Sequence, residues 1–442
     1  MSSLNGVVIF KSLAVSSAFD LKSVRAWLVV LAAMVGVSVG LGPLPFYTIG
    51  MFAPELSAEF GWSFAALMGS IAVQSAVVML VSPLAGYAVD RFGARPVAMI
   101  SLTFFGLCFM SLALNNGSLA VFYSQWIVMA VLGAGTLSAT WTQVVNGWFD
   151  RHKGLALGLA SAGSGITGFL IKPFVAWLII DFGWRMAFVA VGLLPIVVGL
   201  PTILLFFRER RFVSTAAPSV TKAGDVEADC EAEITGMTLK EALYQKNFWL
   251  MALAFILIAF ALTAPTPNLE NILKLRGFSL AEIGSITSSF GLAVIVGRLI
   301  GGWLLDRIWA PLCAFSILLV PAVGSVLLTQ PELTAPIVLF AVIALGLGAG
   351  FEFDLLAYLI SRYFGQRNYG LIYGCFFTVV AFGGGLGPVV YGLAFDTLGN
   401  YIFALVAGGA LLVVGGALLL ILGPYPDLTK YGKRAQSSDS EE

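Results

Sequence analysis

Charged residues are scarce in this chain of 442 residues: Asp, Glu, Lys and Arg make up 11% of it, whereas hydrophobic residues make up 59%. A soluble protein carries about 25% charged residues, so most of this chain does not face water. The 24 basic and 24 acidic residues cancel to a formal net charge of zero. There is therefore no electrostatic reason to expect a nucleic-acid partner.

Histidine and cysteine are also rare, which argues against several kinds of chemistry. The single histidine, His152, stands in the polar stretch "DRHKG", so neither a Ser-His-Asp triad nor a histidine metal site is supported. The four cysteines show no metal-ligand spacing, and a disulfide framework is not expected. The glycine-rich stretches lack the lysine of a nucleotide-binding loop and favour close helix packing instead. We expect no cofactor, no metal and no enzyme activity.

Long apolar runs recur along the chain, each close to the roughly 20 residues that carry a helix across a hydrocarbon core of about 30 Å. The expected fold is an all-α membrane protein with twelve membrane-spanning helices. Their expected ranges are 27–53, 63–88, 97–115, 119–148, 155–180, 186–207, 248–271, 281–305, 310–329, 333–361, 370–395 and 401–423.

One polar stretch divides the spans into two sets of six. It contains "GDVEADCEAE", which is too polar and acidic to bury anything and indicates a flexible linker. The expected organisation is a lead at 1–26, a six-helix bundle at 27–207, a linker at 208–247, a second bundle at 248–423 and a tail at 424–442.

The two halves repeat each other in sequence. "GYAVDRFGAR" and "GWLLDR" place Gly, Asp and Arg at positions displaced by 216, and "GPLP" at 42–45 answers "APTP" at 264–267. An even number of helices per half gives both copies the same topology, a parallel repeat. Such a pair of bundles places its binding site between the halves, near the membrane midplane.

Basic residues are distributed unevenly between the two sides of the membrane. With both termini on one side, that side holds 19 of the 24 Lys and Arg, and the other side holds three. The remaining two, Lys172 and Arg298, lie inside spans. Because Lys and Arg concentrate in cytoplasmic loops, both termini are expected to be cytoplasmic.

The stretch "GYAVDRFGAR" resembles the signature between the second and third helices of the major facilitator superfamily. The matching residues, expected to act as a gating motif, are Gly86, Asp90, Arg91, Gly93 and Arg95, with Asp306 and Arg307 in the partial second copy. Asp90 can pair at helix ends while the arginines bridge to other helices. Such contacts hold the inner side shut and yet remain weak enough to break.

Several other stretches resemble a narrower group. "KGLALGLASAGSGITGFLIKPFVAWLIIDFGWRMAF" looks like the fifth helix of the monocarboxylate transporter family, and "GRLIGGWLLDR" resembles its eighth. "FEFDLLAYLISRYFGQRNYGLIYG" is similar to the tenth-to-eleventh hairpin of bacterial members and oxalate/formate-type relatives. The resemblance implies a monomeric carrier in the lipid of a bacterial inner membrane. It would move a small organic monocarboxylate together with a proton by alternating access.

The sequence departs from these families at three places. Tyr47 stands where the animal carriers have a proton-handling lysine, and Val294 stands where they have an aspartate. The oxalate-type carriers have an additional lysine in the eleventh span, and 370–395 contains none. A single carboxylate is therefore a better expectation than a dicarboxylate held by two cations.

Arg298 is the first candidate for binding the substrate. It lies eight residues before Asp306, about 12 Å along a helix at about 1.5 Å per residue. A guanidinium grips a carboxylate bidentately and stays charged, and leaving it unpaired in lipid is costly. We therefore expect Arg298 to face the cavity and hold the substrate's carboxylate. A structural ion pair and snorkelling to the surface are the alternatives.

Glu352 and Asp354 are the candidates for proton coupling. They break the repeat, since Leu137 and Ala139 hold the equivalent positions. Two residues apart, they point about 200° apart on a helix and cannot both line one cavity. Asp354 shares a face with Arg362, so a structural ion pair is its alternative role. A carboxyl group in apolar surroundings takes up a proton more readily, and Glu352, with fewer cationic neighbours, is the first choice.

Other polar residues inside the spans leave alternatives open. Lys172 lies in the outer third of the fifth span, where its stem can reach headgroups or its charge can attract an anion at the outer vestibule. Further candidate substrate ligands on helices expected to line the cavity are Tyr47, Trp141, Gln143, Asn146, Asn268 and Tyr358. Tyr and Trp are also ordinary packing residues.

Three alternative functions are weighed against monocarboxylate–proton symport. Two keep the fold: uptake of an aromatic or plant-derived acid, and exchange of organic anions with no net proton. The third is a membrane sensor that binds a ligand without transporting it. Such a protein usually shows a sizeable folded cytoplasmic domain, which neither the linker nor the tail "KRAQSSDSEE" supplies.

Overall fold

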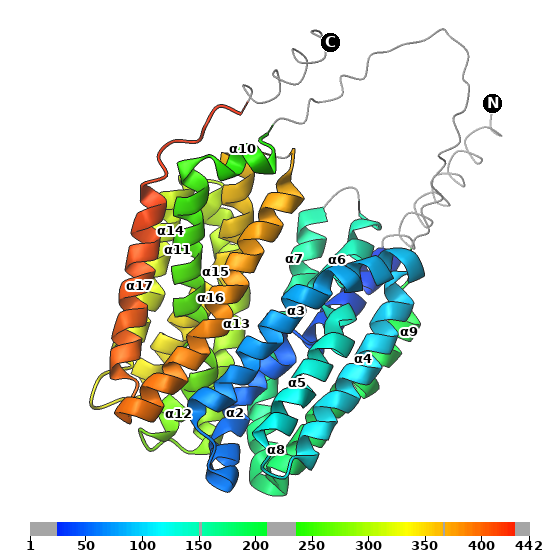
Figure 1. The fold of residues 1–442 in the computed structure, drawn as a ribbon, viewed down its shortest axis with the longest axis vertical. Helices are drawn as coiled ribbons and strands as arrows, with labels where there is room; N and C mark the ends of the chain where they lie inside the picture. Colours follow the sequence, from blue (N-terminus) through cyan, green and yellow to red (C-terminus); the bar gives the residue numbers. More distant parts are fainter. Residues whose placement is uncertain (1–23, 150–152, 210–235, 366, 429–442) are drawn as a thin grey trace, which may run out of the picture.

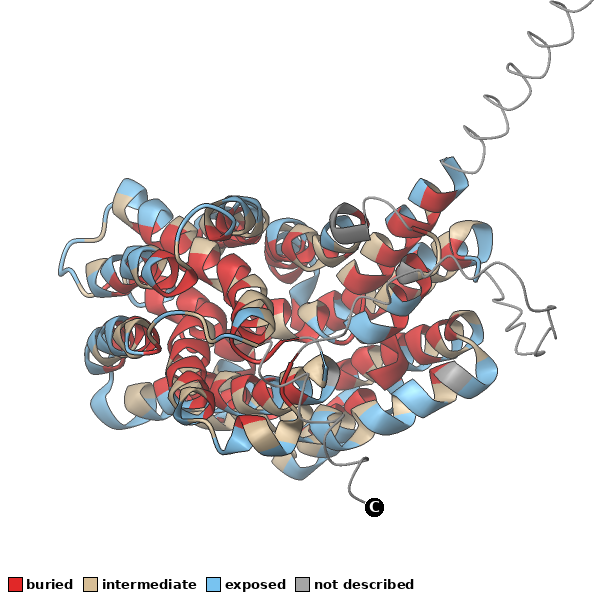
Figure 2. Cartoon of the chain, turned by 90° about the horizontal axis from the view of Figure 1, so that it is seen from above, coloured by how far each residue is buried: buried red, intermediate tan, exposed pale blue. Residues whose placement is uncertain are grey.

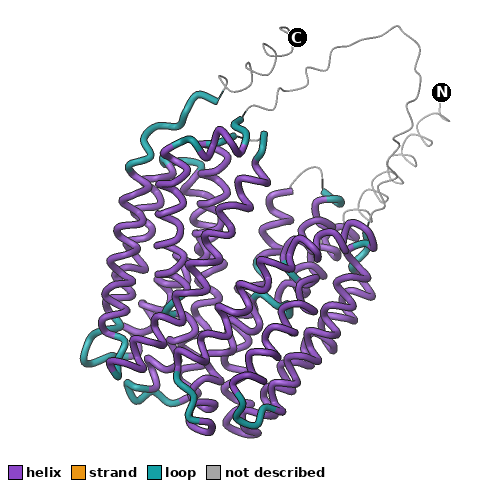
Figure 3. The backbone as a smooth tube through the Cα atoms, in the orientation of Figure 1, coloured by secondary structure: helices purple, strands orange, loops and turns teal. Residues whose placement is uncertain are grey.

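The computed structural model describes residues 24–149, 153–209, 236–365 and 367–428. Within these ranges every regular element is a helix (Figure 3). The helices form two bundles that stand side by side, one from each half of the chain (Figure 1). This arrangement confirms the predicted all-α fold with two six-helix halves.

The N-terminal bundle starts with a helical segment over 24–38. It continues with α2 (Pro43–Phe60), α3 (Phe64–Phe92), α4 (Ala94–Ser111), α5 (Leu119–Gly133), α6 (Ser138–Asn146), α7 (Lys153–Ser161), α8 (Gly163–Leu194) and α9 (Leu200–Phe206). Serine side chains begin two of these helices: Ser63 accepts a hydrogen bond from the N–H of Ala66, and Ser118 accepts one from Val121. Such caps satisfy backbone donors that the first helical turn leaves unpaired.

The C-terminal bundle repeats this order. It contains α10 (Leu239–Leu243), α11 (Lys246–Thr263), α12 (Leu269–Lys274), α13 (Leu280–Leu305), α14 (Ala310–Leu327), α15 (Ala335–Tyr363), α16 (Tyr369–Leu398) and α17 (Ile402–Leu420). Here Ser279 and Glu282 form a capping box at the start of α13.

Eleven helical stretches within the described residues are long and apolar enough to cross a membrane. One of them, Ala156–Phe206, has 51 residues, about 76 Å of helix at 1.5 Å per residue and more than twice the thickness of a hydrocarbon core. Gly183 interrupts it with φ of +78°, a conformation that glycine adopts without strain. The stretch is therefore two spans, and the prediction of twelve is confirmed.

The first span of each bundle is interrupted at its proline motif. The helical segment 24–38 ends in a turn before α2 starts at Pro43. In the other bundle α11 ends at Thr263, and the short turn η4 (Thr266–Asn268) leads into α12. Proline lacks the backbone donor that would continue a helix, so the motifs at 42–45 and 264–267 break equivalent spans.

The fourth span is also interrupted, which the sequence did not predict. Between α5 and α6 the chain makes a 3-10 turn, η2 (Ala134–Thr136). Trp141 stabilises this break, since it is fully buried and its Nε1 donates to the carbonyl oxygen of Thr136 at 2.8 Å. The equivalent span of the other bundle, α15, runs unbroken from Ala335 to Tyr363.

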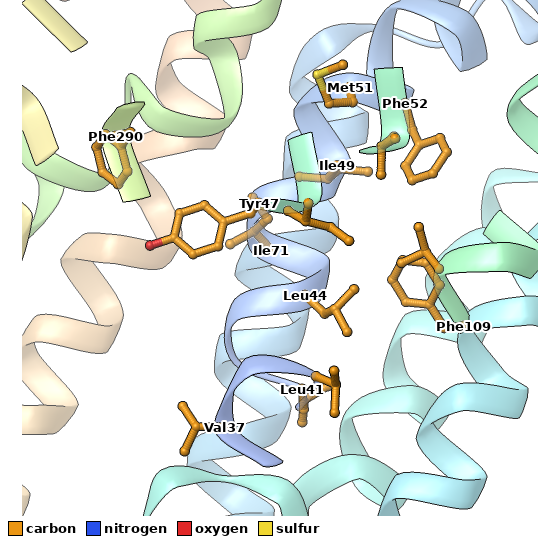
Figure 4. Close-up of a cluster of buried hydrophobic side chains, with 14 of the residues drawn as sticks. Val37, Leu41, Leu44, Tyr47, Ile49, Met51, Phe52, Ile71, Phe109 and Phe290 are labelled. Carbon is orange, nitrogen blue, oxygen red and sulfur yellow. The ribbon is translucent and has the colours of Figure 1, made fainter. Parts of the chain in front are cut away.

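Apolar side chains occupy both the inside and the outside of the molecule. Leu44, Phe52 and Phe109 belong to the core of the N-terminal bundle (Figure 4). On the outside, Leu80 is 72% exposed and Phe403 is 71% exposed. Figure 2 shows the buried residues between the helices and exposed ones around the rim. An apolar outer surface of this extent suits lipid and not water.

The two bundles contact each other mainly through α8 against α13 and α3 against α16. We call the side where residues 24 and 428 lie the terminal side and the opposite side the distal side; the bundles diverge toward the terminal side (Figure 1). Several polar contacts join the bundles toward the distal side. They include Lys172–Glu270, Lys274–Glu55, and the Asp396 carboxylate with the backbone N–H groups of Phe64 and Ala65.

The end of the predicted linker is folded onto the C-terminal bundle. Met237 is buried, and its N–H donates to the carbonyl oxygen of Phe364 at 2.8 Å. Thr238 then begins α10 with a capping box. The C-terminal bundle therefore starts before residue 248, where the sequence placed it. Most of the predicted lead, linker and tail lies outside the described residues.

Candidate functional site

Close packing of α13 on α15 positions the intramembrane arginine. A Cβ atom at Gly297 would overlap the carbonyl oxygen of Leu347, and one at Gly301 would overlap the ring of Phe351. Only glycine lets the two helices approach this closely. Arg298 follows Gly297, so the same contact brings its side chain near the acidic segment of α15.

Arg298 stands among helices of both bundles. Its charge acts electrostatically on Tyr47 of α2, Asp354 of α15 and Tyr373 of α16. No carboxylate oxygen of the described residues lies within 4.0 Å of its guanidinium. Its Nε is enclosed and has no hydrogen-bond partner there either. The structural ion pair weighed from the sequence is thus not formed in this conformation.

The side chain of Arg298 does not share the outward direction of its neighbours. Leu299 is 68% exposed and Ile300 is also exposed, whereas Arg298 is half-buried. The guanidinium therefore keeps its donors available next to the interface between the bundles. A planar cation with unoccupied donors is suited to a carboxylate ligand.

Tyr47 belongs to the other bundle, and the charge of Arg298 acts on it. Its ring packs edge to face against Phe290 of α13, with ring centroids 6.0 Å apart. Figure 4 shows the Tyr47 hydroxyl pointing away from Leu44 and Ile49 of the N-terminal core and toward the other bundle. No described residue forms a hydrogen bond with this hydroxyl. Tyr47 therefore offers a hydroxyl group to the space between the bundles.

The two acids of α15 differ in their surroundings, as their spacing predicts. Glu352 is buried at 3% exposure, and its Oε1 has no hydrogen-bond partner among the described residues. Asp354 is half-buried. Both act electrostatically on Tyr373 of α16, so the acids, the arginine and this tyrosine form one group.

The alternative ion pair between Asp354 and Arg362 is not formed. Arg362 instead donates through Nε and Nη2 to the hydroxyl of Tyr358, at 3.2 and 3.0 Å. Its guanidinium also lies over the rings of Tyr358 and Tyr425. Tyr358 is thus engaged at the terminal end of α15, away from the group around Arg298.

Four other predicted ligands remain, and the three whose side chains are described lie in different surroundings. Trp141 is engaged at the break of the fourth span, and the Nδ2 of Asn268 donates to the carbonyl oxygens of Ala264 and Pro388 at 2.9 and 3.1 Å. Gln143 is exposed on α6. The side chain of Asn146 lies outside the described part. A ligand role for any of these residues stays a prediction.

Lys172 is neither at the membrane surface nor unpaired. Its side chain is 1% exposed and its Nζ lies 2.6 Å from Oε1 of Glu270 on α12. The side chain therefore does not extend to the headgroups in this conformation. A role in holding an anion would require this pair to open.

The predicted gating motif docks on the end of the N-terminal bundle. Gly93 has φ of +92°, and a Cβ there would lie 2.9 Å from Oε2 of Glu209. Glu209 accepts a hydrogen bond from the backbone N–H of Arg95, and Arg95 donates through Nη2 to the carbonyl oxygen of Leu204 at 2.8 Å. The motif thus joins the start of α4 to the end of α9. The side chain of Asp90 lies outside the described part.

The other motif residues make local contacts. Arg91 donates to the hydroxyl of Tyr87 at 3.1 Å, and Arg307 donates to the carbonyl oxygen of Trp303 at 3.1 Å. In the second copy, Tyr425 takes the place of Glu209, since its hydroxyl accepts a hydrogen bond from the N–H of Ala310. Glu209 and Tyr425 are 216 positions apart, which extends the repeat to the ends of both bundles.

Sequence reasoning missed Tyr373 and Glu270. Tyr373 carries no charge and stands in an aromatic-rich stretch, so nothing distinguishes it before the packing is known. Glu270 falls at the end of the predicted span 248–271, where an acid is expected to reach water. Its partner could have been sought, because Lys172 needs a counter-charge if it is buried.

Comparison with known proteins places this geometry in a family. Residues 26–388 match the family model described as Major Facilitator Superfamily. Monocarboxylate transporter 13 of Bos taurus is 28% identical over 397 residues, covering 88% of this chain and 87% of that protein. Monocarboxylate transporter 11 of Homo sapiens is 26% identical over 411 residues, covering 88% and 80%. The resemblance found in the sequence is confirmed.

Other similar proteins extend the comparison. The hexuronate transporter of Escherichia coli K12 is 26% identical over 395 residues, covering 85% of this chain and 89% of that protein. A crystal structure of a bacterial homologue of the human lysosomal transporter Spinster, inward-facing and unoccupied, aligns with a TM-score of 0.62. It is 16% identical and covers 94% of this chain and 97% of that one. At this identity the likeness shows the fold alone.

Proposed function

Because the chain belongs to the Major Facilitator Superfamily, we propose that it is a secondary active transporter that moves a small organic monocarboxylate with a proton by alternating access. The unpartnered guanidinium of Arg298 is the observation that carries this proposal. The relatives that match over most of their length are named for monocarboxylates and for a hexuronate. A hexuronate also carries one carboxylate, so the compounds in both kinds of name bear a single negative charge.

The membrane is the bacterial inner membrane in this proposal, and the terminal side is cytoplasmic. The support is the excess of Lys and Arg expected on that side of the bundles. With this orientation, a molecule closed on its distal side is inward-facing. Substrate would then leave the site around Arg298 toward the cytoplasm.

Arg298 binds the substrate's carboxylate in this mechanism. A guanidinium that lacks a protein carboxylate is costly to hold in a membrane, and a bound anion supplies the missing partner. Tyr47 lies on the opposite bundle, so its hydroxyl can donate to the same anion. A ligand held by both bundles favours the conformations in which they approach each other, which links binding to the rocking of the halves.

Glu352 takes the proton in this mechanism. Its enclosure without a partner makes the ionised form costly, so a proton allows the carboxyl group to stay where it is. The charges of Glu352 and Arg298 both act on Tyr373, so this residue is the candidate link between the proton site and the anion site. Asp354 is the second candidate, since it lies closer to solvent and also feels the charge of Arg298.

Counterflow in proteoliposomes tests the transport proposal. Vesicles loaded with an unlabelled short-chain monocarboxylate should accumulate the labelled acid transiently, and the uncharged amide of the same acid should not compete. An inward proton gradient should raise net uptake, and a protonophore should abolish that increase. Absence of saturable counterflow for every monocarboxylate in a panel would contradict the proposal, and counterflow without any gradient effect would indicate anion exchange.

An aromatic monocarboxylate is a second candidate substrate, favoured by the rings of α16. Tyr369, Tyr373 and Phe377 stack in sequence along this helix, with centroids 5.9 and 6.4 Å apart. Phe377 is 46% exposed, and the charge of Arg298 acts on Tyr373. A substrate ring could stack on these side chains while its carboxylate binds Arg298.

Competition between alkyl and aryl acids distinguishes the two candidates. If the substrate is aromatic, phenylacetate should inhibit counterflow more strongly than propionate does, and Phe377→Leu should reduce that preference. Equal inhibition by the two acids in the unaltered protein would leave the aliphatic monocarboxylate as the substrate class.

A further inference from the structure

A buried ion pair joins the two bundles away from the site of Arg298. Lys172 of α8 and Glu270 of α12 approach to 2.6 Å, and their side chains are 1% and 2% exposed. Gly284 of α13 contacts Lys172 and precedes Arg298 by 14 residues on the same helix, about 21 Å at 1.5 Å per residue. The pair therefore lies on the distal side of the central group.

The carboxylate of Glu270 is inserted into the opposite bundle. A Cβ atom at Gly50 of α2 would overlap both Oε2 of Glu270 and the carbonyl oxygen of Pro267. The carboxylate thus lies between α2 and α8, with glycine on one wall and Lys172 on the other. Neither charged group has a conventional hydrogen bond with another described residue. Each charge depends on the other for its compensation.

Weaker contacts surround this pair on the same face. Lys274, also on α12, lies 3.6 Å from Glu55 of α2, and both side chains are substantially exposed. The Asp396 carboxylate accepts hydrogen bonds from the N–H groups of Phe64 and Ala65 at 3.0 and 2.8 Å. Exposed ion pairs contribute little, whereas a buried pair that loses one partner leaves an uncompensated charge. Of these two ion pairs between the bundles, Lys172–Glu270 is therefore the one that costs most when a single partner is removed.

We infer that Lys172 and Glu270 form a latch that holds the distal side closed, and that separating them is a required step toward the outward-open conformation. When the bundles move apart on this side, water enters and solvates both charges, so the latch can open without leaving either charge in an apolar setting. If one charge is removed, the other is left buried without a partner, but only in the closed form, because water solvates it in the open form. The equilibrium therefore shifts toward the open form. The latch depends on alternating access, which is part of the proposed function, and not on the anion carried.

Spin-label distances on the full chain test the latch directly. The four cysteines are replaced by serine, and labels are attached at Asn116→Cys and Glu332→Cys, which are exposed in distal loops of different bundles. In lipid nanodiscs, Lys172→Met and Glu270→Gln should each enlarge the population with longer distances. The exchanged pair Lys172→Glu with Glu270→Lys should return the distribution toward that of the unaltered protein.

Two further variants keep the test decisive. Glu59→Gln removes an ion pair with Arg185 that is 2.7 Å long and lies within the N-terminal bundle, so it should leave the distances unchanged. Glu270→Asp retains the charge but withdraws the carboxylate by one carbon, so it should also lengthen the distances. This variant is used in place of any single variant that does not fold. Unchanged distances in the latch variants, or an exchanged pair that behaves like the single variants, would overturn the inference.

Discussion

Tyr47 and Phe290 lie edge to face across the two bundles, with ring centroids 6.0 Å apart and planes at 62°. Phe290 is on the same helix as Arg298, and Tyr47 is on a helix of the other bundle. This contact holds only while the bundles keep their present relative position. The surroundings of Arg298 therefore change when the bundles rock, which is what a site served by alternating access requires.

The hydroxyl of Tyr47 is expected to contribute to substrate affinity. Tyr47→Phe removes one donor and leaves the ring contact with Phe290 in place. The loss of one hydrogen bond is worth about 1 kcal/mol, or about fivefold in the half-saturation constant of counterflow. Tyr123→Phe, which removes a hydroxyl that donates to the carbonyl oxygen of Ala66 within the N-terminal bundle, serves as the control. An unchanged constant in Tyr47→Phe would show that the hydroxyl does not reach the anion.

Glu352 is expected to couple the proton to transport. Glu352→Gln imitates the protonated form permanently, so counterflow should persist while stimulation by an inward proton gradient is lost. The measurement is uptake at a fixed internal pH with and without the gradient. Asp354→Asn is the matched control and should retain the stimulation. If Asp354→Asn loses the stimulation by the proton gradient and Glu352→Gln keeps it, Asp354 and not Glu352 is the residue that couples the proton to transport.

Gly93 is expected to be required for stability of the motif loop. Its backbone combines φ of +92° with ψ of 151°, a region that is essentially open to glycine alone and costs other residues about 1–3 kcal/mol. Gly93→Ala also places a methyl group against Glu209. Thermal unfolding followed by tryptophan fluorescence should show a lower midpoint. Gly86→Ala, where a Cβ meets no atom within 4 Å, should not lower it.

The sequence predicts most of the fold because the membrane imposes simple rules. Span length, the repeat at 216 positions and the distribution of basic residues together indicate two parallel bundles of six helices. The break at η2 could not be predicted in this way, since the stretch 133–140 ("GAGTLSAT") contains none of the prolines that mark the other two interrupted spans. It depends on Trp141 filling a space that only the assembled bundle contains.

The candidate site is less predictable because it is assembled from distant segments. Arg298 and Glu352 are visible as charges within apolar runs, and their rarity singles them out. Tyr373 becomes meaningful only beside them. Lys172 is equally visible as a charge, but its partner lies 98 positions away at a predicted span end. The position of Lys172 along its span suggests snorkelling or attraction of an anion. In the structure α8 packs on α13, and Lys172 pairs with Glu270 of α12.

The affinity of the purified protein for a monocarboxylate, measured by calorimetry with and without the guanidinium, decides whether Arg298 binds the substrate. Arg298→Ala should raise the dissociation constant at least about 30-fold, which corresponds to a loss of about 2 kcal/mol for removing one partner of a charge pair. Arg298→Lys should bind with intermediate affinity. An equal dissociation constant in the unaltered protein and in Arg298→Ala would show that Arg298 does not bind the substrate's carboxylate.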